Sequence, residues 1–217
     1  RGGRLGVRVP DVPDPLPEPR VHTWPAGDPT VRCHHISMGA TEFNTSNVSR
    51  RFRPVTRGGD IVSTLDAADL PQGALSETVF HDVPVRGKGR RIQRRALVPM
   101  VRSTIIPNRP LQLVELHGAG LRRLRVTHGE LIESSSRQYP RTAAWGQALY
   151  NHADFDGLIW RSRQFNDSFA LMLWGDRVDR FADLEADPDI APLPLYAGAG
   201  FDEVQQLADD CGITVVG

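Results

Sequence analysis

Hydrophobic and polar residues follow two patterns along the chain, one typical of strands and one typical of helices. Helices are expected where apolar residues recur at three- and four-residue spacing, at residues 71–84, 139–152 and 202–210, the last ended by Gly212. Short apolar or alternating runs predict strands, because side chains of a strand point alternately to its two faces. The expected strands cover residues 31–36, 52–55, 60–65, 96–106, 111–116, 157–162, 169–174 and 213–216.

These elements occur in a mixed order, with several consecutive strands between isolated helices. The order lacks the regular alternation of a doubly wound fold and predicts a single α+β domain, in which small, mostly antiparallel sheets pack against helices. Residues 9–29 contain seven prolines, which favours an extended arm on the surface of the domain. We therefore expect an N-terminal arm at residues 1–29 and one folded domain at residues 30–217.

One carboxylate interrupts the apolar stripe of the first expected helix. Leu70, Gly73, Ala74, Glu77 and Phe80 follow helical spacing, so Glu77 points where the core should lie. An unpaired carboxylate in a core would be costly. Either an arginine neutralises it or it faces a ligand pocket.

Composition narrows the class of protein. The 217 residues are 40% hydrophobic and 24% charged, enough for a real core, and the 26 basic residues equal the 26 acidic ones. This balance predicts no direct binding of nucleic acid or membrane, and the basic run at residues 86–95 is interpreted as a solvated loop. The sequence contains no apolar stretch long enough to span a membrane and no apolar core of a signal peptide, although it begins with Arg rather than Met.

Cysteine and histidine do not indicate a metal site. The two cysteines are far apart and in no metal-ligand spacing, so a cytoplasmic protein without a disulfide framework is expected. The histidines are too scattered to compose a zinc site from sequence, although His81 lies one turn after Glu77 and could bond to it. The residues considered are Cys33, Cys211, His34, His35, His81, His117 and His128.

Three motifs carry a resemblance to a known family. They are RFRPV at residues 51–55, GALSETVFHDVPV at 73–85 and DGLIWRSR at 156–163. Together with shorter similarities over most of the chain, they make it resemble the RES family, named for its arginine, glutamate and serine. In this chain those residues correspond to Arg51, Glu77 and Ser162.

The resemblance implies a bacterial toxin that consumes NAD+ in a cleft similar to that of ADP-ribosyltransferases. The nicotinamide–ribose bond would be cleaved by phosphorolysis or hydrolysis, with NAD+ as substrate, inorganic phosphate as one candidate nucleophile and no metal. Such a reaction passes through an oxocarbenium-like transition state, which a carboxylate such as Glu77 can stabilise. Arg32 and Arg51 would bind the pyrophosphate or phosphate, and Ser162 would hydrogen-bond the substrate or Glu77.

One position departs from the family pattern. Asp66 stands where the family has a tyrosine, eleven residues before the glutamate and on the nicotinamide side of the expected site. Asp66 and Glu77 could then share the pocket, and like charges held close would raise the pKa of one of them. Reduced or altered activity is one consequence.

Two alternatives to free NAD+ cleavage stay open. The same scaffold could transfer ADP-ribose to a protein, or a weakly active module could serve mainly to bind an antitoxin. The resemblance implies an Xre-like helix-turn-helix antitoxin as partner, through which any DNA contact would be made. The oligomeric state, a homo-oligomer included, is not determined by the sequence.

Overall fold

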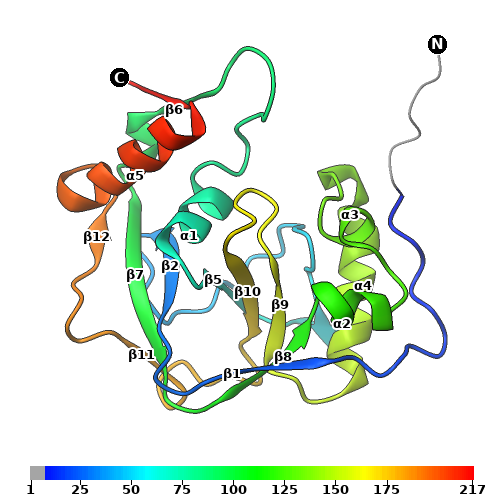
Figure 1. Cartoon of the computed structure of the whole chain (residues 1–217). Coiled ribbons are helices and arrows are strands. Elements are labelled where there is room, and N and C mark those ends of the chain that lie inside the picture. Colours follow the sequence, from blue (N-terminus) through cyan, green and yellow to red (C-terminus); the bar gives the residue numbers. More distant parts are fainter. Residues whose placement is uncertain (1–7) are drawn as a thin grey trace, which may run out of the picture.

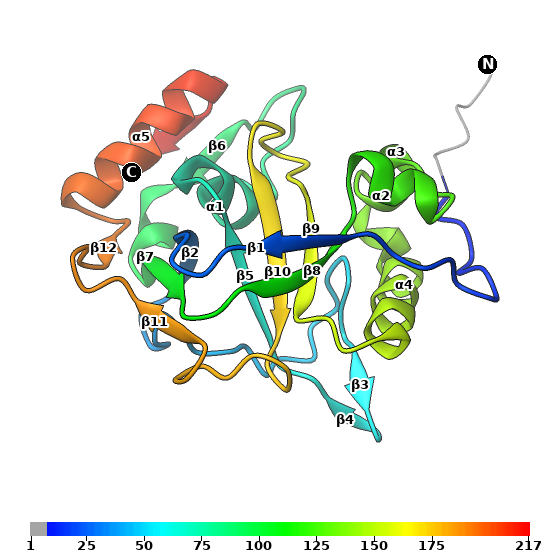
Figure 2. The same cartoon turned by 60° about the horizontal axis from the view of Figure 1, so that its bottom comes forward.

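A curled nine-stranded sheet runs through the molecule, which is described here by a computed structural model of residues 8–217 (Figures 1 and 2). The strand order is β1-β8-β9-β10-β5-β2-β7-β11, with β12 also pairing with β7. Its neighbouring strands pair antiparallel, except for β8 and β9. The strands are β1 (Val21–Trp24), β2 (Thr30–His35), β5 (Thr64–Ala68), β7 (Met100–Pro107), β8 (Leu111–Glu115), β9 (Gly157–Arg161), β10 (Phe169–Trp174), β11 (Leu184–Ala186) and β12 (Leu193–Pro194).

Two small ribbons complete the β structure of the described residues. β3 (Thr56–Arg57) pairs with β4 (Asp60–Ile61) in an antiparallel hairpin. β6 (Arg91–Gln93) pairs in parallel with β13 (Thr214–Val216), which ties the basic loop to the C-terminal end of the chain. The prediction of a single α+β domain with mostly antiparallel strands is confirmed, with most strands gathered in one large sheet.

The helices form two groups on different parts of the large sheet (Figures 1 and 2). One group is α2 (Gly118–Arg123), α3 (His128–Leu131) and α4 (Tyr139–His152), and the other is α1 (Pro71–Thr78) and α5 (Gly198–Cys211). Two 3-10 turns, η1 (Arg94–Leu97) and η2 (Ser136–Gln138), precede β7 and α4. No helix among residues 8–217 is long and apolar enough to cross a membrane.

Helix α4 illustrates how an apolar stripe in the sequence becomes the buried face of a helix. Trp145 and Leu149, one turn apart, are buried in the same core cluster as Leu158 and Trp160 of β9. Burial of large apolar side chains in this way is the main favourable contribution to folding. The bounds of α4 and of β10 are those expected from the sequence.

Other segments differ from expectation. Residues 52–55 do not form a strand: Phe52 lies in a turn, Arg53 makes only an isolated bridge to Arg50, and Phe52 and Val55 are in the core. The strand expected at 60–65 is divided between β4 and β5, and the helix expected at 71–84 ends at Thr78. The strand expected from residue 96 begins at Met100, because η1 occupies Arg94–Leu97.

The proline-rich segment is tied to the domain where it is described. Its residues Val21–Trp24 form β1, which pairs with β8, and Val9 is fully buried in the same core cluster as Trp145. Trp145 Nε1 donates a hydrogen bond to the Pro10 carbonyl at 2.9 Å. Residues 1–7 lie outside the described part, and the division at residue 29 stays a prediction.

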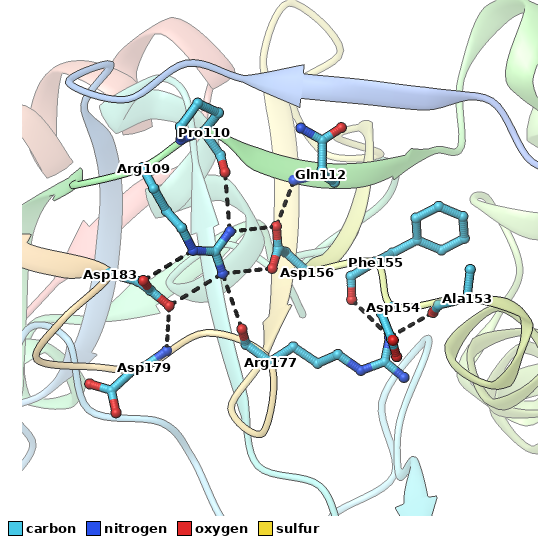
Figure 3. A network of polar contacts seen from close by, with 10 residues as sticks. All are labelled: Arg109, Pro110, Gln112, Ala153, Asp154, Phe155, Asp156, Arg177, Asp179 and Asp183. Carbon is cyan, nitrogen blue, oxygen red and sulfur yellow. Dashed lines mark hydrogen bonds and ion pairs between the residues drawn. The ribbon is translucent and has the colours of Figure 1, made fainter.

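A network of ion pairs and hydrogen bonds around Arg109 links several loops that connect strands of the sheet (Figure 3). Arg109, in the turn after β7, donates to both carboxylate oxygens of Asp156 at 2.8 and 2.9 Å and pairs with Asp183 at 3.0 Å. Asp156 also accepts from the Gln112 backbone N–H at 2.7 Å. This set, here called the Arg109 network, joins the connections that lead into β8, β9 and β11.

Candidate functional site

Helix α1 lies close against the sheet because a glycine faces it. A Cβ on Gly73 would lie 2.0 Å from Ser168 Oγ and 3.2 Å from the Ala68 side chain, so a larger residue would push the helix away. Ala74 and Leu75 are buried beside it. This close packing brings the C-terminal half of α1, with Glu77, beside the ends of β2, β5 and β10.

Glu77 is held from behind by the segment that follows β9. Its Oε1 accepts hydrogen bonds from Ser162 Oγ at 2.6 Å and from the Arg163 backbone N–H at 3.1 Å. Its Oε2 accepts none from residues 8–217, and the side chain is partly exposed rather than buried in the core. Glu77 therefore keeps one carboxylate oxygen free.

Ser162 is fully buried and has no capacity left for a ligand. Its hydroxyl donates to Glu77 and accepts from the backbone N–H groups of Gln164 and Phe165 at 3.2 and 3.1 Å. A serine hydroxyl has one donor and two acceptor positions, and all three are used. In this geometry Ser162 positions Glu77, which was one of the two roles expected for it.

Arg51 and Arg32 are buried, and no carboxylate among residues 8–217 is in direct contact with either guanidinium group. Arg51, 9% exposed, donates to the hydroxyl and carbonyl oxygens of Ser134 at 3.1 and 3.4 Å. Arg32, 4% exposed, donates from Nη1 to the carbonyls of Ala40 and Glu42 at 2.7 and 2.6 Å. Burial lowers the pKa of both guanidinium groups, and the nearby Glu77 and Asp66 only partly oppose it.

Asp66 lies on the exposed face of β5. Its side chain is 54% exposed, and Arg53 Nη2 approaches its Oδ2 at 3.4 Å, too loosely for a well-formed hydrogen bond. The other end of the Arg53 guanidinium donates to Thr64 Oγ1 at 3.1 Å. Arg53 was not among the expected site residues, although its two-residue spacing from Arg51 placed both on one side of the segment, opposite Phe52.

These side chains line one cavity of about 470 Å³, in the range usual for small-molecule sites. Arg32, Arg51, Asp66 and Glu77, all expected from sequence, meet there with Arg53, while Ser162 lies behind Glu77. Apolar lining comes from side chains of β9 and β10 and from helix α1, namely Trp160, Ala170, Leu171, Met172 and Ala74.

The remaining polar lining does not suggest a metal. His81 also faces the cavity, but it bonds to Asp82 at 2.9 Å instead of Glu77. Residues 8–217 contain no group of three or more His, Cys, Asp or Glu side chains arranged to hold a metal ion. The site combines cationic donors for an anion with the free Oε2 of Glu77 and the loosely paired carboxylate of Asp66.

Comparison with known proteins agrees with the motifs. The family model of the RES domain matches residues 30–195. Among solved structures, the fold is similar to a chain in the crystal structure of the M. tuberculosis MbcT–MbcA toxin–antitoxin complex, with a TM-score of 0.60 and 12% identity, over 86% of this chain and 92% of that one. No curated protein matches the chain significantly.

Proposed function

Because the chain belongs to the RES domain family, we propose that it is an enzyme that consumes NAD+ by cleaving the nicotinamide–ribose bond. We propose further that it acts as a toxin held inactive by a cognate antitoxin. The observation that carries the enzymatic proposal is the pairing, in one cavity, of a positioned carboxylate with three buried arginines.

The arginines suit the anionic part of NAD+. Pyrophosphate oxygens accept forked hydrogen bonds from guanidinium groups, and Arg32 and Arg51 have such donors without a carboxylate to occupy them. Their burial strengthens an electrostatic contact relative to one in water. Arg32 and Arg51 therefore serve as the anchors for the phosphates.

Glu77 suits the reacting ribose. As the bond to nicotinamide breaks, positive charge develops on the anomeric carbon and ring oxygen, and a nearby carboxylate lowers the energy of that state. Ser162 and the Arg163 N–H fix Oε1, so Oε2 is the atom directed to the substrate. A positioned group avoids the cost of reorganising in the transition state.

The nucleophile that completes the reaction is phosphate or water. With phosphate the new bond joins the anomeric carbon to a phosphate oxygen and yields ADP-ribose-1-phosphate, whereas water yields ADP-ribose. The cationic cavity favours phosphate as the acceptor. A protein acceptor would instead leave ADP-ribose attached to a protein.

A single assay tests substrate, reaction and acceptor. The purified chain is incubated with NAD+, with and without phosphate, and the products are identified by mass. We expect loss of NAD+, release of nicotinamide and, with phosphate, ADP-ribose-1-phosphate. Unchanged NAD+ with protein shown to be folded would refute the proposal, and label on protein alone would favour the transferase.

Glu77→Gln is the matched variant for this assay. The amide oxygen can still accept from Ser162 and Arg163, so the fold is retained while the negative charge is lost. We expect turnover to fall by about 10²–10³-fold, the usual cost of removing one electrostatic stabiliser. Equal turnover by Glu77→Gln would remove Glu77 from catalysis.

The antitoxin proposal rests on the family and on the fold shared with a chain of a toxin–antitoxin complex. We propose an Xre-like helix-turn-helix protein as the partner, covering the cavity and contacting DNA on behalf of the complex. Co-expression with the neighbouring gene product should give a stable complex without NAD+ turnover. A complex that turns over NAD+ as fast as the free chain would contradict inhibition by cavity blockage.

A further inference from the structure

We propose that Asp66 is an internal competitor for anions, and that with Arg53 it sets how tightly the cavity holds phosphoryl groups. No other residue of the described cavity combines an exposed carboxylate with a buried arginine as its ion-pair partner. The inference rests on the proposed function only in taking this cavity as the substrate site.

The carboxylate of Asp66 lies near two arginines and is bound firmly by neither. Arg53 approaches it at 3.4 Å, and Arg32 is close enough for Asp66 to raise its pKa against the effect of burial. Among residues 8–217, no hydrogen bond to the Asp66 side chain accompanies these contacts. Asp66 thus partly compensates the positive charge of the two arginines but accepts no hydrogen bond from them, so their N–H groups stay available to a ligand.

The arginines cannot move away to form a better pair. Arg53 is 9% exposed and anchored by Thr64, and Arg32 is 4% exposed and anchored by carbonyls of residues 39–42. Asp66, in contrast, is on the solvent-facing side of β5 with a side chain that is 54% exposed. The exposed partner is therefore the carboxylate, and the buried, anchored partners are the cations.

An arriving phosphoryl group must share these cations with Asp66. Its oxygens would occupy the same donors and would be repelled by the carboxylate at a few ångströms, where a unit charge has a large effect. Asp66 consequently weakens anion binding and favours release of a phosphorylated product. It is a specificity-determining residue that acts on affinity, and the cleavage itself is left to Glu77.

Binding of inorganic pyrophosphate, measured by titration calorimetry, tests this without any turnover. Asp66→Asn keeps the size of the side chain and removes its charge, and we expect pyrophosphate to bind about tenfold more tightly. Asp202→Asn, on α5, which contributes no residue to the cavity, makes the same change of net charge and should leave the affinity unchanged.

A second variant distinguishes competition at Arg53 from a general effect of net charge on binding. Arg53→Gln should weaken pyrophosphate binding about tenfold in the wild-type background, because it removes a fixed donor. In the Asp66→Asn background its effect should be larger, since Arg53 is then free of its competitor. Unchanged or weaker binding by folded Asp66→Asn, or no effect of Arg53→Gln, would overturn the inference.

The outcomes separate this inference from the proposed function. Tighter pyrophosphate binding by Asp66→Asn in a chain that never cleaves NAD+ would support the anion competitor and refute the enzyme. Turnover of NAD+ with identical pyrophosphate affinities in all variants would support the enzyme and refute the competitor.

Discussion

The Arg109 network and the cavity use the same residue type in opposite ways. Arg109 meets two carboxylates, Asp156 and Asp183, and their hydrogen bonds raise its pKa (Figure 3). Arg32 and Arg51 meet mainly backbone carbonyls and a serine, and burial lowers their pKa.

The difference separates a structural arginine from one kept for a ligand. In the Arg109 network the charges compensate one another within the protein, so no ligand is needed to stabilise them. In the cavity the cost of burying positive charge is not offset by directly bonded carboxylates. That only partly compensated charge is the physical basis for expecting an anionic substrate.

The largest effect should come from opening the Arg109 network. Arg109→Met leaves Asp156, whose side chain is 8% exposed, without its guanidinium partner. We expect a loss of about 3 kcal/mol in the free energy of unfolding. For a chain of this size that lowers the melting temperature by about 6–12 °C.

Calorimetry of Arg109→Met beside Arg57→Met provides the control for this prediction. Arg57 pairs with Asp176 at 3.2 Å but is 71% exposed, so its removal should cost less than about 1 kcal/mol. Equal losses for the two variants would mean that burial and double pairing do not distinguish the network.

Removal of a cavity arginine should change the stability little and the turnover strongly, whereas removal of Arg109 should lower the stability. Arg51→Met deletes a buried charge that has no directly bonded carboxylate, so the free energy of unfolding should change by no more than about 1 kcal/mol in either direction. Turnover of NAD+ should fall about 100-fold, because a fixed phosphate donor is lost. The melting temperature and the rate are measured on the same preparation; a loss of stability as large as that of Arg109→Met would abolish the contrast.

A smaller effect is expected from the residue behind Glu77. Ser162→Ala removes the 2.6 Å hydrogen bond to Oε1 but leaves that of the Arg163 N–H. We expect kcat to fall about tenfold with KM nearly unchanged, as loosening a catalytic group affects the transition state more than binding. Ser168→Ala, equally buried but bonded to Asp69, should destabilise the fold without that selective loss in kcat.

Some elements and site residues could be predicted from the sequence because they depend on patterns of neighbouring residues. The helical spacing of Trp145 and Leu149 identified α4, and the apolar run at residues 169–174 identified β10 with its exact bounds. Glu77 was visible as a carboxylate in an apolar stripe. Of the two alternatives for it, an arginine partner or a ligand pocket, the second agrees with its place in the structure, where the stripe ends at a cavity and Glu77 is only partly buried.

Long-range pairing explains what the sequence did not predict. β1 lies in a proline-rich segment, and only its pairing with β8, some ninety residues later in the chain, makes it a strand. The run at residues 52–55 resembles a short strand, yet Phe52 and Val55 both enter the core from a segment that forms no strand. The contact between Arg53 and Asp66 likewise depends on where β5 places its exposed face.

The smallest expected effect concerns pH and tests whether the cavity resists further positive charge. His34 lines the cavity, contacts Ser103 Oγ at 2.9 Å, and has its pKa lowered from 6.5 by burial and also by Arg32, while Glu42 and hydrogen bonds to backbone oppose this.

Because the folded pKa lies below the unfolded one, the unfolded chain takes up the proton more readily as the pH falls through 6.5. The contribution of His34 to stability is therefore complete above 6.5 and decreases below it. The melting temperature of His34→Gln, which can still hydrogen-bond Ser103, should fall less steeply with decreasing pH than that of the wild type. His117, whose pKa burial also lowers, is present in both proteins, so the difference between the two slopes belongs to His34. Identical slopes would mean that burial and the nearby Arg32 together impose no measurable penalty on a protonated His34.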